Sequence, residues 1–541
     1  MNTRSRFVVV LTILGSSVFS GGWLLGRGMQ NGSSPLVGAR LFDDVLTHVQ
    51  ERYVDSIPRG ELFDKAMQGM LEELGDPHTL YLPPDRLRRL TESTTGNYTG
   101  LGLQFDVRDG WPTVLAPLPG GPAERAGLKT GDRIVEVEGK GTKGLTTDEL
   151  RTLMRGPIGT RLRVEVERPG VADRIPVTLT RGEIHRRAVR RSALLDGGVG
   201  YVDVKVFSDS TELELSRSID SLAKAGMQSL ILDLRANPGG LLSQGVEVAD
   251  VFLDPGAEIV SIKGRIPESN RTFSDDAKQR WPKLPLVVLI DEGSASASEI
   301  VAGALQDHDR AVIIGRTSYG KGSAQSLYPT NSGGALKLTT ARWYTPAGRS
   351  IDRVRSRGGD GERPDAGEPA ARPRFRTSDG RVVLGGGGIT PDVVAGDSAL
   401  SPEELALQSA LVGRIPDFRD ALTAYAISQK TAGTVRTPNF SVTPAMLDGL
   451  WTLMRARGLT VDRATYDAAS PLVSQLLGRE IARFVFDAAT EAARAIREDE
   501  VVQAAATLAA GARTQEEILR RAARQGEAEK VAEAPDAARP R

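Results

Sequence analysis

The sequence contains no cysteine among its 541 residues. This absence excludes disulfides, thiol nucleophiles and cysteine-ligated zinc or iron–sulfur centres. Histidine is also scarce, and the four histidines share no spacing typical of metal ligands: His48, His78, His185 and His308. We therefore expect neither a structural metal nor a cofactor.

The chain also lacks an excess of charge of either sign. Lys plus Arg and Asp plus Glu both number 69, so the net charge is zero. A balanced charge offers no overall attraction for nucleic acid, and we expect no nucleic-acid partner. The length of 541 residues predicts roughly three to four domains, because single cores stop growing well below that size.

An apolar stretch, Phe7–Leu25, follows Arg4 and Arg6 within residues 1–30. Its length approaches the ~20 residues that span a bilayer, and the arginines would stay on the cytoplasmic side. We expect a signal-anchor or transmembrane segment. The alternative is a cleaved signal peptide, whose cleavage site Ser20-Gly21-Gly22 imitates only loosely. Either way we expect a cell-envelope protein at the inner membrane, with its catalytic domains on the exported, periplasmic side.

Hydrophobic periodicity predicts a multidomain fold of the α/β plus β class. In order, it predicts a helical region at 38–95, a β-rich domain at 96–182, an α/β core at 190–398, a helical extension at 400–525 and a disordered tail at 526–541. Continuous apolar runs in the α/β core predict strands covered on both faces: Ser229–Leu234, Leu286–Ile290 and Val312–Ile314. The segment Arg353–Gly380, rich in Arg, Gly, Pro and Asp, predicts a mobile insertion.

Helix-boundary signals are clear in the extension. Ser401-Pro402-Glu403-Glu404 fits a capping box, and Thr443-Pro444 fits an N-cap followed by proline at the first helical position. Gly458 is placed to close the second of these helices.

A serine triplet, Ser294-Ala295-Ser296-Ala297-Ser298, connects the predicted strand Leu286–Ile290 to a helical pattern. A serine at a strand-to-helix turn is held where it can act as a nucleophile, and amides at the helix start stabilise developing negative charge. The alternative is that the three serines simply compete as helix N-caps, and the triplet alone favours this interpretation.

Lys321 provides a possible base for such a nucleophile. It lies between Gly320 and Gly322, shortly after the predicted strand Val312–Ile314. Burial lowers the pKa of a lysine, and a general base near neutral pH needs a pKa of about 7–8 instead of ~10.4. The hypothesis therefore requires a dry pocket around the amine.

Several motifs together resemble the carboxyl-terminal processing peptidases, also called tail-specific proteases. The serine–lysine signature is carried by Gly293-Ser294-Ala295-Ser296-Ala297-Ser298-Glu299 and Gly320-Lys321-Gly322-Ser323-Ala324-Gln325. The resemblance extends from about residue 40 to 395 and includes Asp76-Pro77-His78-Thr79, Leu234-Arg235-Ala236-Asn237-Pro238-Gly239-Gly240, Tyr344-Thr345-Pro346-Ala347-Gly348-Arg349 and Gly388-Ile389-Thr390-Pro391-Asp392.

The resemblance implies that Ser296 is the nucleophile, Lys321 its general base and Gln325 the orienting residue. It also implies an oxyanion hole, which the amides of Gly240 and Ala297 would form. The amide of Gly239 remains an alternative to that of Gly240 as a donor to the oxyanion. Preorganised donors of this kind are typically worth ~3–4 kcal/mol each in the transition state.

The β-rich block resembles a PDZ domain. Its loop Gly100-Leu101-Gly102-Leu103 looks like the loop that binds a terminal carboxylate, with the adjacent strand edge taking the peptide by β-addition. For this loop alone, a simple glycine turn between strands is an equally good interpretation.

The implied function is a serine endopeptidase that cleaves exported proteins near their C-termini. Its substrates would be polypeptides with flexible C-terminal tails. The N-terminal segment would bind the membrane, and the chain would form a homo-oligomer or bind an activating partner. The alternative is a membrane-anchored PDZ adaptor with an inactive peptidase-like domain.

Two other readings of the motifs fit less well. A phosphate-binding loop ending at Lys321 would need Ser or Thr at position 322 and a helix after it, but Gly322 and Leu327-Tyr328-Pro329 follow. A Ser–His–Asp site would need His308, which we expect to be a solvated residue at a helix end.

Overall fold

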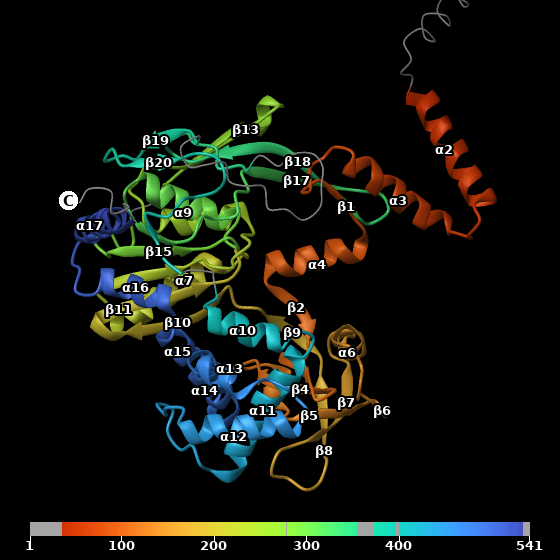
Figure 1. Cartoon of the computed structure of the whole chain (residues 1–541). Helices are drawn as coiled ribbons and strands as arrows, with labels where there is room; N and C mark the ends of the chain where they lie inside the picture. The colour runs from red at the N-terminus through yellow and green to blue at the C-terminus, as the bar shows by residue number, and fades with distance from the viewer. Residues whose placement is uncertain (1–34, 277–278, 354–371, 397–399, 534–541) are drawn as a thin grey trace, which may run out of the picture. The chain divides into compact units, whose positions relative to one another are not determined.

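The computed structural model describes residues 35–276, 279–353, 372–396 and 400–533 (Figure 1). Within these ranges the chain divides into two compact units, one formed by the described residues up to 87 with 325–339 and the other by the described residues of 88–324 and from 340 onward. The predicted anchor, Phe7–Leu25, lies outside the described residues. Within the ranges given above, no helix combines the length and the apolar character that crossing a membrane requires.

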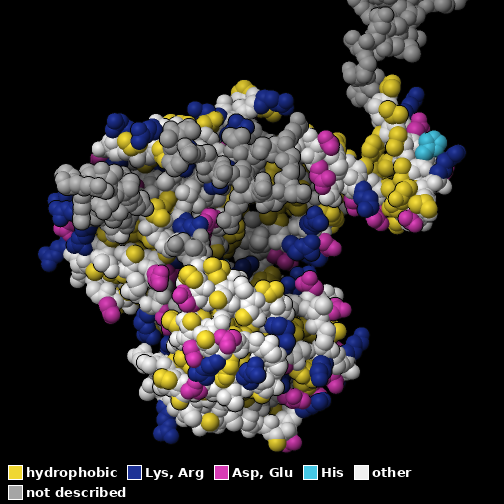
Figure 2. Space-filling view, viewed as in Figure 1, with side chains coloured by type: hydrophobic (Ala, Val, Ile, Leu, Met, Phe, Trp, Pro, Cys, Tyr) yellow, Lys and Arg dark blue, Asp and Glu magenta, His cyan; other side chains and the backbone are white. Residues whose placement is uncertain are grey.

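The first unit contains the predicted N-terminal helices. Its elements are α2 (Pro35–Arg52), α3 (Arg59–Glu72), β1 (Leu80–Leu82) and the start of α4 (Pro84–Thr95). β1 pairs antiparallel with the first residues of β18 (Ala335–Tyr344), where Leu80 lies opposite Lys337. Apolar side chains of α2 are exposed, as the yellow surface over this helix in Figure 2 shows: Leu36, Val37, Leu41 and Val45.

A small β-rich domain follows at the start of the second unit. Its sheet has the order β3-β4-β5-β7-β8, with β6 beside β5 and β3 at one edge. These strands are β3 (Leu103–Arg108), β4 (Trp111–Pro117), β5 (Arg133–Val137), β6 (Lys140–Gly141), β7 (Arg161–Glu167) and β8 (Ile175–Thr180). The domain also holds α5 (Pro122–Arg125) and α6 (Thr147–Met154), and β2 (Asn97–Gly100) pairs with β9 (Gly182–His185) beside it.

A six-stranded sheet forms the α/β core, in the order β10-β11-β12-β15-β16-β21. All neighbours are parallel except β10 and β11. The strands are β10 (Val189–Leu195), β11 (Val199–Val204), β12 (Ser229–Asp233), β15 (Leu286–Ile290), β16 (Val312–Gly315) and β21 (Val393–Val394). The three apolar runs predicted as buried strands are therefore confirmed.

Helices cover both faces of this sheet, which explains why its strands are apolar throughout. One face packs against α7 (Thr211–Lys224), α8 (Leu242–Asp250) and α9 (Ala297–Asp307). The opposite face packs against α16 (Glu500–Ala509) and α17 (Gln515–Glu533) from the C-terminal extension. Three further strands form part of a second sheet. β13 (Glu258–Gly264) pairs antiparallel with β14 (Arg271–Ser274) on one side and with β18 on the other, so that Ile262 lies opposite Arg271 and Trp343.

The rest of the extension is helical, as predicted. It consists of α10 (Pro402–Ala410), α11 (Ile415–Ala432), α12 (Pro444–Ala456), α13 (Arg463–Ala468), α14 (Ser470–Ile481) and α15 (Ala488–Arg497). The predicted boundaries are confirmed: Ser401 and Glu404 form a capping box, Thr443 accepts from the Met446 amide, and Gly458 follows α12 with φ 74°.

Two sequence expectations need correction. Residues 354–371 of the expected mobile insertion lie outside the described residues, but its last part is folded: β19 (Arg374–Arg376) pairs with β20 (Val382–Leu384). The Arg372 guanidinium fixes this hairpin by donating to the carbonyl groups of Gly385 and Gly388. At the C-terminus, α17 continues to Glu533, past residue 526 where the tail was expected to begin.

Candidate active site

The predicted nucleophile lies in the turn between β15 and α9. Ser296 occupies the N-cap position with φ 56° and is partly exposed. A non-glycine residue in this conformation costs of order 1–3 kcal/mol and persists only where its surroundings hold it. Its two neighbours in the triplet differ, because Ser294 and Ser298 are fully buried and donate to the carbonyl groups of Leu234 and Asn237, at 2.8 and 2.9 Å. The outer serines thus have structural partners, and Ser296 is the accessible one.

Glu299 joins the nucleophile turn to the lysine loop. Its side chain is fully buried, and its carboxylate accepts from the amides of Ser296 at 2.8 Å, Gly320 at 2.7 Å and Lys321 at 2.9 Å. The Ser318 hydroxyl donates to the same carboxylate at 2.5 Å. Two segments more than twenty residues apart are therefore held by one side chain.

Burial raises the pKa of Glu299, although the four donors oppose this shift by favouring the charged form. The spacing from Ser296 to Glu299 is that of a capping box, but from the sequence alone Glu299 was named only as part of the family motif. Its contacts with residues 320 and 321 depend on tertiary structure, and no local pattern indicates them.

Lys321 lies in the loop after β16, and hydrogen bonds from Trp343 of β18 hold the backbone of this loop. The Trp343 indole donates to the Lys321 carbonyl oxygen at 3.1 Å, and the Trp343 amide donates to the Gly322 carbonyl oxygen at 2.9 Å. Asp352 accepts from the Gly322 amide at 3.0 Å. The following residues form the strand β17 (Ser323–Pro329). A phosphate-binding loop would lead into a helix, so that reading is wrong.

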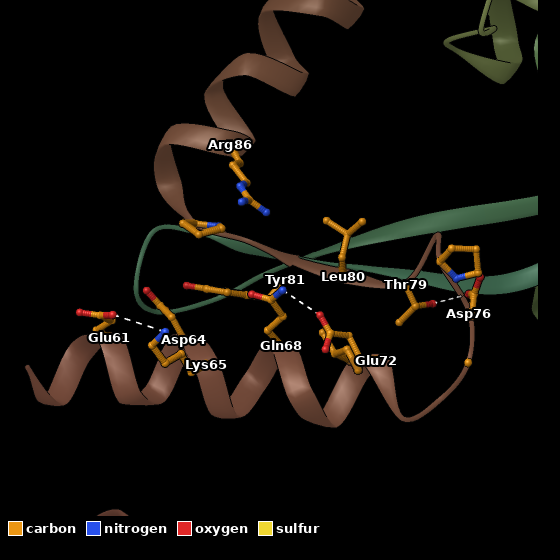
Figure 3. A pocket seen from close by; sticks show the side chains of 14 residues that line it. Glu61, Asp64, Lys65, Gln68, Glu72, Asp76, Thr79, Leu80, Tyr81 and Arg86 are labelled. Atoms are coloured by element: carbon orange, nitrogen blue, oxygen red, sulfur yellow. Dashed lines mark hydrogen bonds and ion pairs between the residues drawn. The ribbon is translucent and has the colours of Figure 1, made fainter. Parts of the chain in front are cut away.

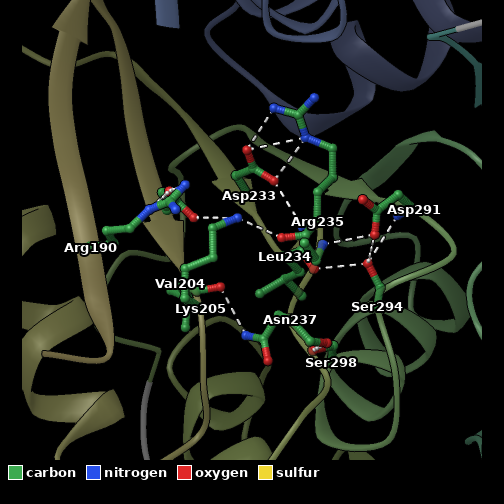
Figure 4. Close-up of polar contacts among 12 residues, drawn as sticks. Arg190, Val204, Lys205, Asp233, Leu234, Arg235, Asn237, Asp291, Ser294 and Ser298 are labelled. Carbon is green, nitrogen blue, oxygen red and sulfur yellow. Dashed lines mark hydrogen bonds and ion pairs between the residues drawn. The ribbon is translucent and has the colours of Figure 1, made fainter. Parts of the chain in front are cut away.

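The turn after β12 lies beside the nucleophile turn. A Cβ atom on Gly239 would meet the Ala295 carbonyl oxygen at 2.6 Å and the Ala297 amide nitrogen at 2.9 Å, so this approach requires glycine. The Gly239 amide donates to Asn237 at 2.9 Å, and the Asn237 side-chain amide donates to the Val204 carbonyl at 2.9 Å (Figure 4). The sequence Asn-Pro-Gly-Gly therefore forms a turn that its own asparagine fixes.

Gly240 follows on the exposed side of this turn. It forms an isolated bridge with Phe207 at φ 154°, where a Cβ atom would meet the Phe207 carbonyl oxygen at 2.0 Å. Ala297 is the first residue of α9. The first amides of a helix have no acceptor inside it and are available to an anion.

His308 lies at the opposite end of α9 from Ser296. The twelve residue steps from Ser296 to His308 span about 18 Å, since an α-helix rises about 1.5 Å per residue. Its Nε2 is 2.6 Å from the Glu258 carbonyl oxygen, and the side chain is partly buried. His308 therefore lies at a helix end as predicted, although it is partly buried and not fully solvated, and its position rules it out as the partner of Ser296.

Gln325, the predicted orienting residue, belongs to the first unit. Its side-chain amide donates to Thr339 at 3.2 Å. The same unit contains a pocket of about 700 Å³, whose walls include Asp76, Thr79 and Tyr81 (Figure 3). Burial opposes ionisation of Asp76, but hydrogen bonds from Thr339, Thr79 and the His78 amide hold its pKa below the ordinary value.

The predicted carboxylate loop connects β2 to the edge strand β3. Leu101 is buried, and Gly102 has φ 67°. The carbonyl group of Leu101 accepts from the Ala123 amide at 2.9 Å, and that of Gly102 accepts from the Leu118 amide at 2.8 Å. Hydrogen bonds to the rest of the domain therefore fix the loop.

Comparisons with known proteins agree with this architecture. A model of peptidase family S41 matches residues 198–360, and a model of the PDZ domain matches residues 113–168. The carboxy-terminal-processing protease of Bartonella bacilliformis is 39% identical over 317 residues, which make up 58% of this chain and 72% of that protein. The carboxy-terminal processing protease CtpA of Bacillus subtilis is 35% identical over 303 residues, 56% of this chain and 64% of that protein.

Among solved structures, the photosystem II D1 C-terminal processing protease has 31% sequence identity. The match covers 66% of this chain and 87% of that chain, with a TM-score of 0.35. The matches of the two family models lie in the α/β core and in the β-rich domain. The fold and the sequence together define a serine-type peptidase with a PDZ domain. The chain belongs to the carboxy-terminal processing proteases of peptidase family S41.

Proposed function

We propose that this protein is an endopeptidase in which Ser296 is the nucleophile and Lys321 its general base. The observation that carries the proposal is the Glu299 carboxylate, which binds the backbone amides of both residues within the protein interior. A buried carboxylate with amide donors from two segments is a rigid link, because leaving any of these groups unpaired would cost about 1–3 kcal/mol. The link supports a fixed geometry between the two functional side chains.

The chemistry then proceeds through an acyl-enzyme. The Ser296 oxygen attacks the scissile carbonyl carbon as its proton passes to the neutral amine of Lys321. When the tetrahedral intermediate collapses, the carbon–nitrogen bond breaks and the lysine returns the proton to the leaving amine. Water then attacks the ester, again with Lys321 as the base, and releases the product acid and free Ser296.

The amides of Gly240 and Ala297 are the proposed donors to the oxyanion. The hydrogen bond from Gly239 to Asn237 supports Gly240 over its neighbour, since that bond already occupies the Gly239 amide. The close approach of Gly239 to Ala297 supports a shared site at the start of α9.

Gln325 is proposed to orient Lys321, as the resemblance implies. It lies in β17, four residues after the lysine in the sequence.

The PDZ domain is proposed to capture substrate tails. Carbonyl and amide groups of one peptide unit point in opposite directions. The Leu101 and Gly102 carbonyl groups accept hydrogen bonds from amides of the domain itself. The amides of Gly102 and Leu103 therefore face away from the domain, toward the proposed position of a terminal carboxylate. β3 is an edge strand, which supports β-addition of the peptide behind that carboxylate.

The two lines of evidence for membrane attachment come from the sequence. The apolar stretch Phe7–Leu25 and the preceding Arg4 and Arg6 support an anchor that leaves the peptidase on the exported side of the inner membrane. Fractionation of cells that express the full chain, compared with a variant lacking residues 1–30, tests this. Recovery of both forms in the soluble fraction would contradict an anchor.

The rival proposal is a PDZ adaptor with an inactive peptidase domain. Hydrolysis of an unfolded polypeptide by the purified protein discriminates between the two. Ser296→Ala and Lys321→Ala are each expected to lower kcat by at least about 10³-fold. His308→Ala serves as the control and is expected to leave kcat nearly unchanged. Because only the neutral amine accepts a proton, kcat/KM should also rise with pH on an alkaline limb. Cleavage that survives Ser296→Ala would rule out the proposed mechanism.

A further inference from the structure

Arg235 holds two carboxylates at once, and one of them comes from the C-terminal extension. Its guanidinium donates to Asp233 at 2.8 to 3.2 Å and to both oxygens of Asp499 at 2.9 and 3.1 Å. The Arg235 and Asp499 side chains are 18% and 29% exposed. A bidentate arginine–carboxylate pair fixes direction as well as distance, particularly where water has little access.

The position of Arg235 gives this ion pair its significance. Arg235 immediately precedes the turn Ala236–Gly240 that carries the proposed oxyanion donor. Figure 4 shows its side chain running away from the turn, toward the C-terminal helices drawn in blue. Its carbonyl oxygen accepts from Lys205, and the next residue, Ala236, has φ 53° and donates its amide to Asp291 at 2.8 Å. A strained non-glycine residue keeps this conformation only while its neighbours are fixed.

Asp499 is itself held in place. It is the N-cap of α16, and its carboxylate accepts from the Val502 amide at 3.0 Å. α16 is anchored to the sheet by the buried side chains Val502 and Ala505, and by a hydrogen bond from Ser229 to the Ala509 carbonyl at 3.1 Å. The carboxylate therefore presents a fixed surface to Arg235.

We propose that Asp499 is a positioning residue for catalysis, which acts through Arg235 to hold the Gly240 amide in the geometry of the oxyanion hole. This inference rests on the proposed role of Gly240. The C-terminal extension would then complete the active site, since Asp233 alone leaves one side of the guanidinium fork unsupported. Donors to an oxyanion must be held within about 0.5 Å of their productive position, so a small relaxation of the turn reduces the rate.

The test compares Asp499→Asn with Glu498→Gln in the full chain. Asparagine is as good an N-cap as aspartate, so the first variant keeps the helix start and removes the charge that faces Arg235. Glu498 is the matched control, because its carboxylate binds Arg479 at 3.0 Å and Arg494 at 2.7 Å, both within the extension. Asp499→Ser, which retains a capping oxygen, provides a second variant if the first is poorly folded.

Asp499→Asn is expected to lower kcat about tenfold with KM changed less than about twofold, the pattern of an interaction made only in the transition state. A peptide aldehyde, whose adduct places an oxyanion in the hole, should bind more weakly by the same factor as kcat/KM falls. Glu498→Gln should alter neither quantity. An unchanged kcat, an effect on KM alone, or equal losses in both variants would overturn the inference. If Ser296→Ala also left hydrolysis intact, the proposed function itself would fail, whereas loss of hydrolysis in that variant confines the failure to Asp499.

Discussion

At the scale of single residues, one buried carboxylate organises the candidate site. Glu299 accepts from three backbone amides and one hydroxyl, and three of these four donors belong to the segment 318–321. Replacing it with glutamine exchanges one acceptor oxygen for a donor, so at least one buried amide loses its partner. Glu299→Gln should therefore lower the free energy of unfolding by about 1–3 kcal/mol. It should also lower kcat by about 10²-fold or more, as measured by chemical denaturation and steady-state hydrolysis.

Glu404→Gln is the control for this change, because Glu404 occupies the same position in a capping box away from the site and accepts from the Ser401 amide at 2.9 Å. Its hydrolysis should match the wild-type rate.

The raised pKa of Glu299 adds a pH signature: the folded state binds this proton more tightly than the unfolded chain, so stability falls as pH rises through the folded-state pKa. That decline should be missing in Glu299→Gln, and a decline of equal size in both proteins would assign it to other groups.

The residues of the site differ in how far the sequence could predict them. Ser296 was ambiguous between an N-cap and a nucleophile, and it occupies an N-cap position that is also strained and partly exposed. Glu299 carried a local capping signal that hides its second role. No local signal indicates the contact of Asp499 with Arg235, because these residues are 264 positions apart in the sequence. Contacts between residues so far apart in the sequence follow from tertiary packing, which local sequence patterns do not indicate.

At the scale of single elements, the loop before β3 is where we propose that the PDZ domain binds a substrate tail. A valine at position 102 would combine a left-handed backbone with contacts of 3.1 to 3.2 Å to Ile184, Gly121 and Pro122. The loop would have to shift, and Gly102→Val should weaken binding of a C-terminal peptide at least about tenfold, a loss of ~1.4 kcal/mol. Calorimetry with a peptide that ends in a free carboxylate, and with its amide as a comparison, measures this.

Gly110 offers a matched control at the other end of β3. It has φ 74°, and a Cβ atom there would meet nothing within 4 Å. Gly110→Val therefore introduces similar backbone strain without disturbing the loop. Equal weakening in the two variants would mean that general destabilisation of the domain, and not the loop, controls binding.

Elements with strong periodicity were the easiest to predict. β15 matches its predicted bounds, while β12 and β16 differ from theirs by one residue each at the C-terminal end. The hairpin of β19 and β20 was missed because each strand has only three residues and β19 lies within a segment rich in Arg, Gly, Pro and Asp. Partners outside these strands hold the hairpin in place: Arg372 donates to the carbonyl groups of Gly385 and Gly388, Arg381 pairs with Asp309 and Asp392, and Val383 is buried.

At the scale of the whole molecule, the C-terminal extension is part of the peptidase core and not an appendage. α16 and α17 supply one of the two layers that cover the central sheet. Val502 is 1% exposed in that layer, so Val502→Asp would bury a charge without a partner. The free energy of unfolding should fall by more than about 3 kcal/mol, as measured by urea denaturation.

Val412, in the same extension, is 74% exposed and provides the control. Val412→Asp should change stability by no more than about 0.5 kcal/mol. Comparable losses from both substitutions would contradict the view that α16 belongs to the core. The sequence predicted the helices of the extension but not this role, because a helix with an apolar face does not reveal which surface that face covers.

The central claim is that Lys321 activates Ser296, and covalent labelling tests it most directly. A fluorophosphonate forms a phosphorus–oxygen bond with an activated serine as fluoride leaves, and intact-mass analysis with peptide mapping locates the adduct. The wild-type protein should gain a single adduct at Ser296, and Lys321→Ala should react at least about 10²-fold more slowly at neutral pH. An adduct at another residue, or a labelling rate that Lys321→Ala leaves unchanged, would contradict the account.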